Sequence, residues 1–191
     1  MKKTLLATAT LSLLLTSGVA LAQNTSSGSI NFTGSVTNAA CTVDGQGPNG
    51  AINIALGQYG QKELSEKGKF TGWSEERLSF SNCILKLDEE TALTGIDLEI
   101  TGSGKATTAN SQLFSNEATG GAGNVGVEIR VDDVLVDPIN GLTAKAPLVK
   151  SGSDENAVGS VSFKVAGRIV ATDKATPGAV AASVKFNAIY R

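Results

Sequence analysis

Few side chains in this sequence are of the types that carry chemistry. Its 191 residues include two cysteines and no histidine, so the usual general base near neutral pH and the commonest metal ligand are missing. This excludes Ser-His-Asp and Cys-His mechanisms. Cys41 and Cys83 are the only possible intrachain pair in an oxidising compartment. We expect them to form a structural disulfide, because no Cys-x-x-Cys spacing indicates redox chemistry.

Three further patterns could form binding sites, and each has a simpler interpretation. Residues 121–126 match the glycine spacing of a dinucleotide fingerprint, but they precede a predicted strand instead of linking a strand to a helix. The acidic runs 88–90 and 132–133 lack calcium-loop spacing and indicate solvated turns. Trp73 could stack on a sugar, although a single Trp in the middle of a β chain more often packs against its own protein. We therefore predict no catalytic residue, no cofactor and no metal site.

Composition and charge indicate one soluble domain. The chain is 41% hydrophobic and 18% charged, which excludes a disordered polyelectrolyte and an integral membrane protein. Its formal net charge of −2 provides no basic surface for nucleic acid or anionic membranes. Nucleic acid is therefore not an expected partner.

Residues 1–22 have the pattern of a secretory signal. Lys2 and Lys3 form a charged start, residues 5–19 are apolar or small, and residues 20–22 read Ala-Leu-Ala, a cleavage site. The apolar run is shorter than the ~20 residues that span a bilayer. We expect export, cleavage before Gln23 and no membrane span.

The rest of the chain alternates apolar and polar residues with period two, the pattern of half-buried strands. Ile96, Leu98 and Ile100, for example, alternate with Asp97 and Glu99. Further alternating runs lie near residues 30–36, 52–56, 78–83, 125–131 and 161–169, with a predicted hairpin over 125–136, whereas only 62–67 has weak helical character. Short strands between glycine-rich turns predict an antiparallel immunoglobulin-like sandwich, with a barrel as the competing architecture.

The C-terminal segment has the longest alternation in the sequence. One side carries Gly178, Val180, Ala182, Val184, Phe186, Ala188 and Tyr190. This predicts a strand of about 13 residues, well beyond the usual length. We expect no later segment to cover its outer edge, and an edge this long and apolar needs a partner.

The N-terminal segment of the mature chain has the character of a movable strand. Residues 23–29 are small and polar, and Ile30, Phe32, Gly34 and Val36 then alternate on one face. One chain therefore offers both an open groove and a spare strand that could fill the same groove in a neighbour. Such head-to-tail contacts do not close on themselves, so they build a filament.

Both ends resemble those of chaperone–usher fimbrial pilins of the type 1-like kind. Gly178 is the fourteenth residue from the end and shares its face with Phe186 and the penultimate Tyr190, like the C-terminal motif of these pilins. Residues 28–41 (GSINFTGSVTNAAC) resemble the donor arm and first cysteine of major fimbrial subunits. Residues 124–129 (NVGVEI) are similar to another strand of the family. Arg191, a basic final residue, and residues 46–60 depart from the family pattern.

The resemblance implies an all-β, incomplete immunoglobulin-like sandwich that lacks its last strand. Its parts would be a cleaved signal (1–22), a donor-strand arm (23–36) and the pilin domain (37–191). A periplasmic chaperone would lend the missing strand, and the arm of the next subunit would replace it at the outer-membrane usher. Cys41 and Cys83 match the family disulfide. The implied donor residues are Ile30, Phe32, Gly34 and Val36. The implied acceptor-groove and chaperone contacts are Gly178, Val180, Val184, Phe186, Tyr190 and Arg191. Basic residues of the chaperone would hold the carboxylate of Arg191.

The expected function is therefore a non-enzymatic structural subunit of a bacterial fimbria. It would be exported through the periplasm to the cell surface, polymerise with copies of itself or related pilins, and support adhesion. One alternative is a monomeric carbohydrate-binding or tip-adhesin domain. A secreted enzyme or inhibitor is the other.

Overall fold

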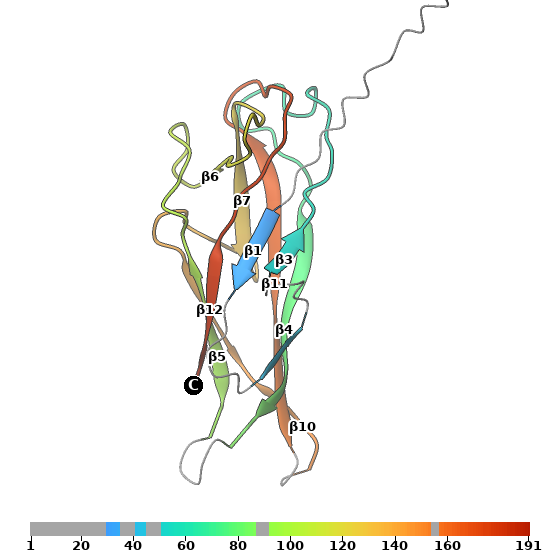
Figure 1. The fold of residues 1–191 in the computed structure, drawn as a ribbon, viewed down its shortest axis with the longest axis vertical. Coiled ribbons are helices and arrows are strands. Elements are labelled where there is room, and N and C mark those ends of the chain that lie inside the picture. Colours follow the sequence, from blue (N-terminus) through green and yellow to red (C-terminus); the bar gives the residue numbers. More distant parts are fainter. Residues whose placement is uncertain (1–29, 35–40, 45–50, 87–91, 154–156) are drawn as a thin grey trace, which may run out of the picture.

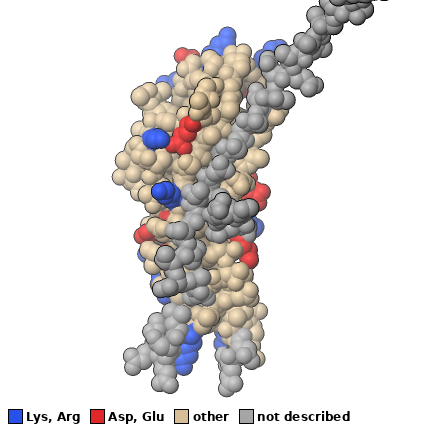
Figure 2. All heavy atoms as spheres, viewed as in Figure 1, with Lys and Arg blue, Asp and Glu red and all other residues tan. Residues whose placement is uncertain are grey.

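The computed structural model describes residues 30–34, 41–44, 51–86, 92–153 and 157–191 (Figure 1). The predicted signal, residues 23–29 of the arm, Val36 and the acidic run 88–90 lie outside the described residues. Among the described residues, no helix is long and apolar enough to cross a membrane. The face of the molecule in Figure 2 carries acidic and basic side chains in scattered positions, without a continuous area of one sign.

The described strands run mostly along the long axis of an elongated molecule. Their bounds are β1 Ile30–Gly34, β2 Thr42–Asp44, β3 Ala51–Ile54, β4 Ser74–Ile84, β5 Gly95–Thr101, β6 Phe114–Ser115, β7 Val125–Val131, β8 Val134–Leu135, β9 Leu142–Pro147, β10 Val149–Ser151, β11 Val158–Ala171 and β12 Lys185–Tyr190.

The described strands form two sheets that pack face to face. One sheet has the order β3-β1-β12-β5-β9, and the other has the order β2-β4-β11-β7-β6, with β10 added to β11 and β8 to β7. Two separate sheets make a sandwich, so the all-β, immunoglobulin-like prediction is confirmed and the competing barrel is wrong.

The core lies between the inner faces of these sheets. In β5, Ile96, Leu98 and Ile100 are buried while Asp97 and Glu99 point outward, as the period of two predicts. In the other sheet, Phe80 of β4 and Phe163 of the neighbouring β11 are both buried, and their rings meet edge to face with centroids 6.1 Å apart. The residues that set the two faces are therefore those that the alternation predicted.

The predicted hairpin over 125–136 is confirmed. β7 pairs with β8 through Val131 and Val134. The two turn residues, Asp132 and Asp133, have φ angles of 46° and 69°. Positive φ at both turn positions gives the backbone twist that suits a two-residue hairpin.

Two local predictions are wrong. Residues 61–64 form turns, closed by bonds such as Glu63 N to Gly60 O at 2.9 Å, and no helix forms over 62–67. The predicted 13-residue final strand is also too long, because β12 has 6 residues and begins at Lys185. Its preceding residues nevertheless keep the predicted alternation, since Val180, Ala182 and Val184 are buried.

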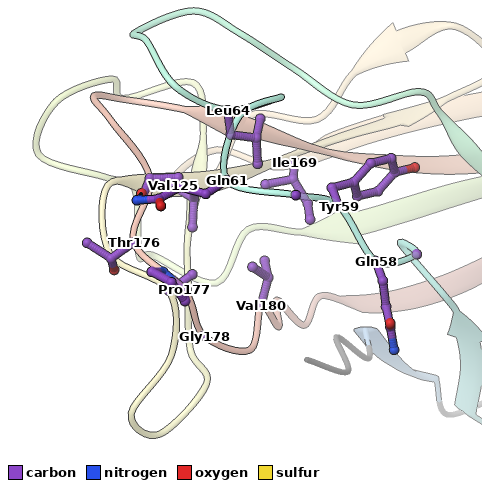
Figure 3. A pocket seen from close by; sticks show the side chains of 14 residues that line it. Gln58, Tyr59, Gln61, Leu64, Val125, Ile169, Thr176, Pro177, Gly178 and Val180 are labelled. Carbon is purple, nitrogen blue, oxygen red and sulfur yellow. Dashed lines mark hydrogen bonds between the residues drawn. The ribbon is translucent and has the colours of Figure 1, made fainter. Parts of the chain in front are cut away.

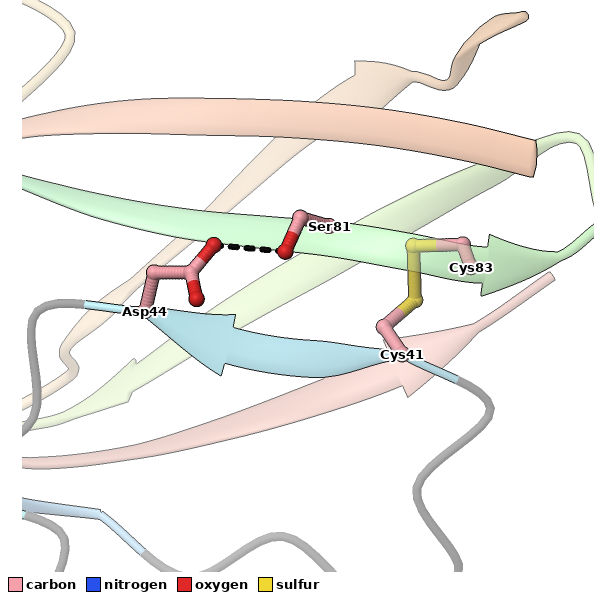
Figure 4. Close-up of a disulfide and its surroundings, with 4 residues drawn as sticks. All are labelled: Cys41, Asp44, Ser81 and Cys83. Carbon is pink, nitrogen blue, oxygen red and sulfur yellow. Dashed lines mark hydrogen bonds between the residues drawn. A yellow bond between two sulfur atoms is a disulfide. The ribbon is translucent and has the colours of Figure 1, made fainter. Parts of the chain in front are cut away.

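Cys41 and Cys83 form the predicted disulfide (Figure 4). It lies beside the short ladder in which Thr42 of β2 pairs with Ser81 of β4. Next to it, the Ser81 hydroxyl donates to the Asp44 carboxylate at 2.6 Å. The disulfide and this ladder together fix the start of the domain to β4.

Replacement of both cysteines by alanine should lower the free energy of unfolding by about 2–5 kcal/mol, because the bond closes a loop with a sequence separation of 42 residues. Urea denaturation of the oxidised protein and the double variant measures the difference. Reductant should destabilise the parent protein and leave the variant unchanged. A difference below about 1 kcal/mol would contradict a structural role.

Candidate functional site

The candidate site is the gap between β3 and β12, and the protein's own β1 occupies it. β1 runs parallel to β12, with Thr33 opposite Lys185 and Gly34 opposite Phe186. It runs antiparallel to β3 over four residue pairs, from Ile30 opposite Ile54 to Thr33 opposite Ala51. Without β1, β3 and β12 would each lack a neighbour on this side. Residues 41–191 therefore leave a groove one strand wide.

Buried apolar side chains form the groove's β12 side. Val184 and Phe186 are each 3% exposed, and Val180 is 6% exposed. Further along β12, Tyr190 is half-buried. The structure thus places four of the predicted acceptor residues on one inward face. Their proposed contact with another protein remains a prediction.

Gly178 has a different environment from these residues. A Cβ atom built on it would lie 2.3 Å from the main-chain nitrogen of Ala122 and 2.5 Å from the carbonyl carbon of Gly121. Its φ angle of 155° also lies in the range that favours glycine. Gly178 is therefore required because two main-chain segments approach closely there.

A hollow of about 200 Å³ extends the groove beyond Val180 (Figure 3). Figure 3 shows Leu64, Ile169 and Val180 pointing towards its centre, with Tyr59 and Gly178 at its margin. Its lining is mainly apolar, so it suits an aliphatic or small aromatic group.

The outer wall of this hollow is the connection between β3 and β4. Two hydrogen bonds join it to the segment before β12: Gln61 Nε2 donates to Ala175 O at 2.7 Å, and Ala175 N donates to Leu64 O at 3.0 Å. The sequence analysis missed this wall, because the segment has neither the strand period nor a recognisable turn motif.

Arg191, at the C-terminal end of β12, is held on the β5 side of the strand, away from the groove. Its terminal oxygen accepts hydrogen bonds from Thr94 N at 2.7 Å and Gly95 N at 2.9 Å. Its guanidinium pairs with Asp97, and Lys145 Nζ lies 3.1 Å from the same carboxylate. The hydrogen bond from Arg191 lowers the pKa of Asp97, partial desolvation opposes this, and Lys145 lowers it further. The terminal carboxylate predicted to bind a chaperone is thus engaged within this sheet.

Tyr190 lies beside this end with its hydroxyl group buried. Within the described part of the chain, that hydroxyl has no hydrogen-bond partner. Burial raises the pKa of Tyr190 above its usual value, so the phenol stays neutral.

The other sequence patterns take part in ordinary packing. The Arg130 and Arg168 guanidiniums lie 4.1 Å and 4.5 Å from the Trp73 ring, so the indole stacks on its own protein. Asp133 pairs with Lys164 at 3.0 Å in the hairpin turn. The described residues contain no cluster of three side chains suited to a metal ion.

The sequence analysis also missed the loop 116–122, which lies against residues 179–181. Ala122 N donates to Ala179 O at 2.9 Å, and Glu117 N donates to Ala181 O at 2.8 Å. The glycine residues between 120 and 126 could have predicted that another main-chain segment lies close to this loop, but not which segment it is.

Gly178→Ala should lower the free energy of unfolding by about 1–3 kcal/mol, because the new methyl group would overlap the main chain of residues 121–122. Gly72→Ala is the matched control, since a Cβ there meets nothing within 4 Å. Urea denaturation should show a change within about 0.5 kcal/mol for the control. Equal effects of the two substitutions would contradict the close-approach explanation.

Asp97→Asn should reduce stability near neutral pH more than in acid. The pKa of Asp97 is lowered in the folded state, so its contribution is present above the ordinary value of 3.8 and is lost as the pH falls through the lower folded value. Denaturation of both proteins at about pH 7 and about pH 2–3 measures this. Glu117, Asp133 and Asp137 also have lowered pKa values but are common to both proteins. A difference that does not shrink in acid would contradict the assigned contact.

Comparison with known proteins agrees with this architecture. The family model described as "Fimbrial protein" matches residues 30–191. The type-1 fimbrial protein A chain of Escherichia coli strain K12 is 27% identical over 183 residues, covering 95% of this chain and 93% of that one. The fimbrial subunit type 1 of Klebsiella pneumoniae is 28% identical over 194 residues, covering 99% and 98%.

A solved structure shares the fold. The crystal structure of the P pilus rod subunit PapA matches with a TM-score of 0.56 and 17% identity, covering 80% of this chain and all of that one. Its likeness supports the incomplete immunoglobulin-like sandwich, while the family match supplies the function. The chain belongs to the fimbrial protein family and is a structural subunit that polymerises with other pilins into fimbriae on the bacterial surface.

Proposed function

We propose that this subunit polymerises by donor-strand exchange, in which residues 23–36 of one copy enter the groove between β3 and β12 of the next. The observation that carries the proposal is the position of β1. A strand from the N-terminal arm lies in a gap that residues 41–191 leave open. A second copy carries the same arm, so it can fill the same gap.

The protein's own arm is a modest occupant of the groove. Among the described residues, its ladder with β12 has two residue pairs, against four with β3. Parallel pairing is also slightly less stable per residue than antiparallel pairing. Because the hollow beyond Val180 extends the groove, an arm that reaches it would bury more apolar surface. This supports exchange of the protein's own arm for that of a neighbour.

The donor residues of the proposal are Ile30, Phe32, Gly34 and Val36, which share one face of the arm. The acceptor residues are Val180, Val184, Phe186 and Tyr190. Gly178 lets residues 121–122 approach closely at the end of the groove near Val180, and so helps to hold that end in place. The donor arm thus comprises residues 23–36, and the domain that receives it comprises residues 37–191.

The proposal also includes two assembly partners. Before a neighbour arrives, a periplasmic chaperone lends a strand to the groove, with basic chaperone residues at the Arg191 carboxylate. An outer-membrane usher then brings two subunits together for the exchange. The process requires no catalytic chemistry from this chain. The tip-adhesin alternative has less support, since the relatives above are named fimbrial subunits.

Deletion of residues 23–36 should abolish fibre growth while chaperone capture in the periplasm persists, because the groove remains and the donor is gone. Fibres are counted by electron microscopy, and capture is measured by co-purification with the chaperone. Phe32→Asp in the full chain is a second variant, since a carboxylate on the apolar face of the arm disfavours insertion. Asn31→Asp, on the opposite face, is its matched control. Normal fibres from the deletion variant would refute the donor assignment.

A further inference from the structure

The main-chain groups of the C-terminal segment alternate between two edges. Arg191 exchanges both of its main-chain hydrogen bonds with Gly95, so the odd-numbered residues of β12 face β5. Ala181, in the extended segment before β12, also directs its main-chain groups to this edge. Its N–H and C=O groups both bind the 116–122 loop. The N–H and C=O groups of Val180 and Ala182 therefore point to the opposite edge, on the side where β1 lies.

Asn116 binds the odd-numbered edge through its side chain. Its Nδ2 donates to Ala179 O and to Ala122 O, both at 2.9 Å. Its Oδ1 accepts from Ala181 N at 2.9 Å and from Ala118 N at 3.1 Å. A carboxamide has two donor hydrogens and one oxygen with two lone pairs, so its full capacity is used.

These hydrogen bonds pair one main-chain edge of residues 179–181, just as β5 pairs the same edge of β12. β5 ends at Thr101, opposite Lys185, and pairs with no residue before Lys185. Beyond that point, the loop 116–122 supplies the partners on the same edge. The segment therefore remains extended, with Val180 and Ala182 buried, although it belongs to no regular ladder.

The surroundings of Asn116 are built for this contact. A Cβ atom on Gly121 would lie 2.6 Å from Asn116 Nδ2 and 2.7 Å from Ala179 O, so glycine leaves room for the hydrogen bond. Next to Asn116, the Glu117 carboxylate accepts from the Ser183 hydroxyl at 2.8 Å. The loop thus holds both Ala181 and Ser183 from the side away from β1.

We propose that Asn116 is a positioning residue for the acceptor groove: its carboxamide holds residues 179–181 extended, so that the main-chain groups of Val180 and Ala182 are aligned to pair with an inserted strand. This rests on the proposed function. Neither aspartate nor alanine can replace the side chain. A carboxylate cannot donate to the two carbonyl groups, and a methyl group can neither donate nor accept.

The test uses the full mature chain with a labelled peptide of residues 23–36 in excess. Asn116→Ala should release bound peptide about tenfold faster than the parent protein, because the main-chain groups of Val180 and Ala182 are no longer aligned to pair with it. Asn116→Asp should also release it faster, because the carboxylate keeps only the accepted bonds. Asn110→Ala is the matched control, since the side chain of Asn110 accepts a local bond from Gln112 N at 3.0 Å. Its release rate should stay within about twofold of the parent value.

Hydrogen exchange separates positioning from general destabilisation. In Asn116→Ala, exchange of the Ala181 amide should accelerate, whereas that of Val165, in the centre of β11, should not. An unchanged release rate in either Asn116 variant, or an equal acceleration at both amides, would overturn the assignment of Asn116. If the parent protein takes up no peptide, donor-strand exchange is refuted instead, and the Ala181 and Val165 amides still decide whether Asn116 orders this segment.

Discussion

The edge of β12 that faces β1 is the constraint on which the rest of the structure depends. The side chains of Val184 and Phe186 are in the core, so this edge lies beside apolar surface and not in open water. Main-chain N–H and C=O groups left unpaired in such a position are costly. A strand must therefore fill the gap between β3 and β12. The subunit uses its own arm here, and in the proposed fibre the arm of a neighbour takes its place.

The other edge of the same segment is secured along its whole length by different means. Near the C-terminus, the ladder with β5 ends in the contacts of Arg191 with Thr94, Gly95 and Asp97. Towards residue 178, hydrogen bonds from a loop replace the ladder, and Gly178 allows that loop to approach. One wall of the groove is thus fixed within the subunit, while its occupant can change. This division suits the proposed donor-strand exchange, in which the subunit must stay folded while one strand replaces another.

The sequence predicted the parts of the fold that depend on periodicity. The inward residues of β5, β7 and β11 follow from a period of two. The hairpin at Asp132 and Asp133 follows because the apolar positions are odd-numbered up to Val131 and even-numbered from Val134 onward. Periodicity cannot tell an extended segment held by a loop from a strand in a ladder, so the start of β12 was misplaced. The weak helical character of residues 62–67 was overridden by tertiary contacts such as Ala175 N to Leu64 O.

The candidate site was predictable where it depends on the chain ends and obscure where it depends on distant contacts. Val180, Val184 and Phe186 share a face in the sequence and in the structure. Asn116 shows no pattern that links it to residues 179–181, because the contact joins residues more than sixty positions apart. The wall of the hollow could not be predicted for the same reason, because Gln61 and Ala175, which form a hydrogen bond there, are 114 residues apart in the sequence. Only the folded chain brings these residues together.

The most direct test is a high-resolution cryo-electron microscopy structure of the assembled fibre, in which the chain trace from Cys41 back to Ile30 is followed. The predicted result is that residues 30–36 of each subunit lie between β3 and β12 of the next subunit. A fibre in which every subunit keeps β1 in its own sheet, with contacts made only by outer surfaces, would contradict the account.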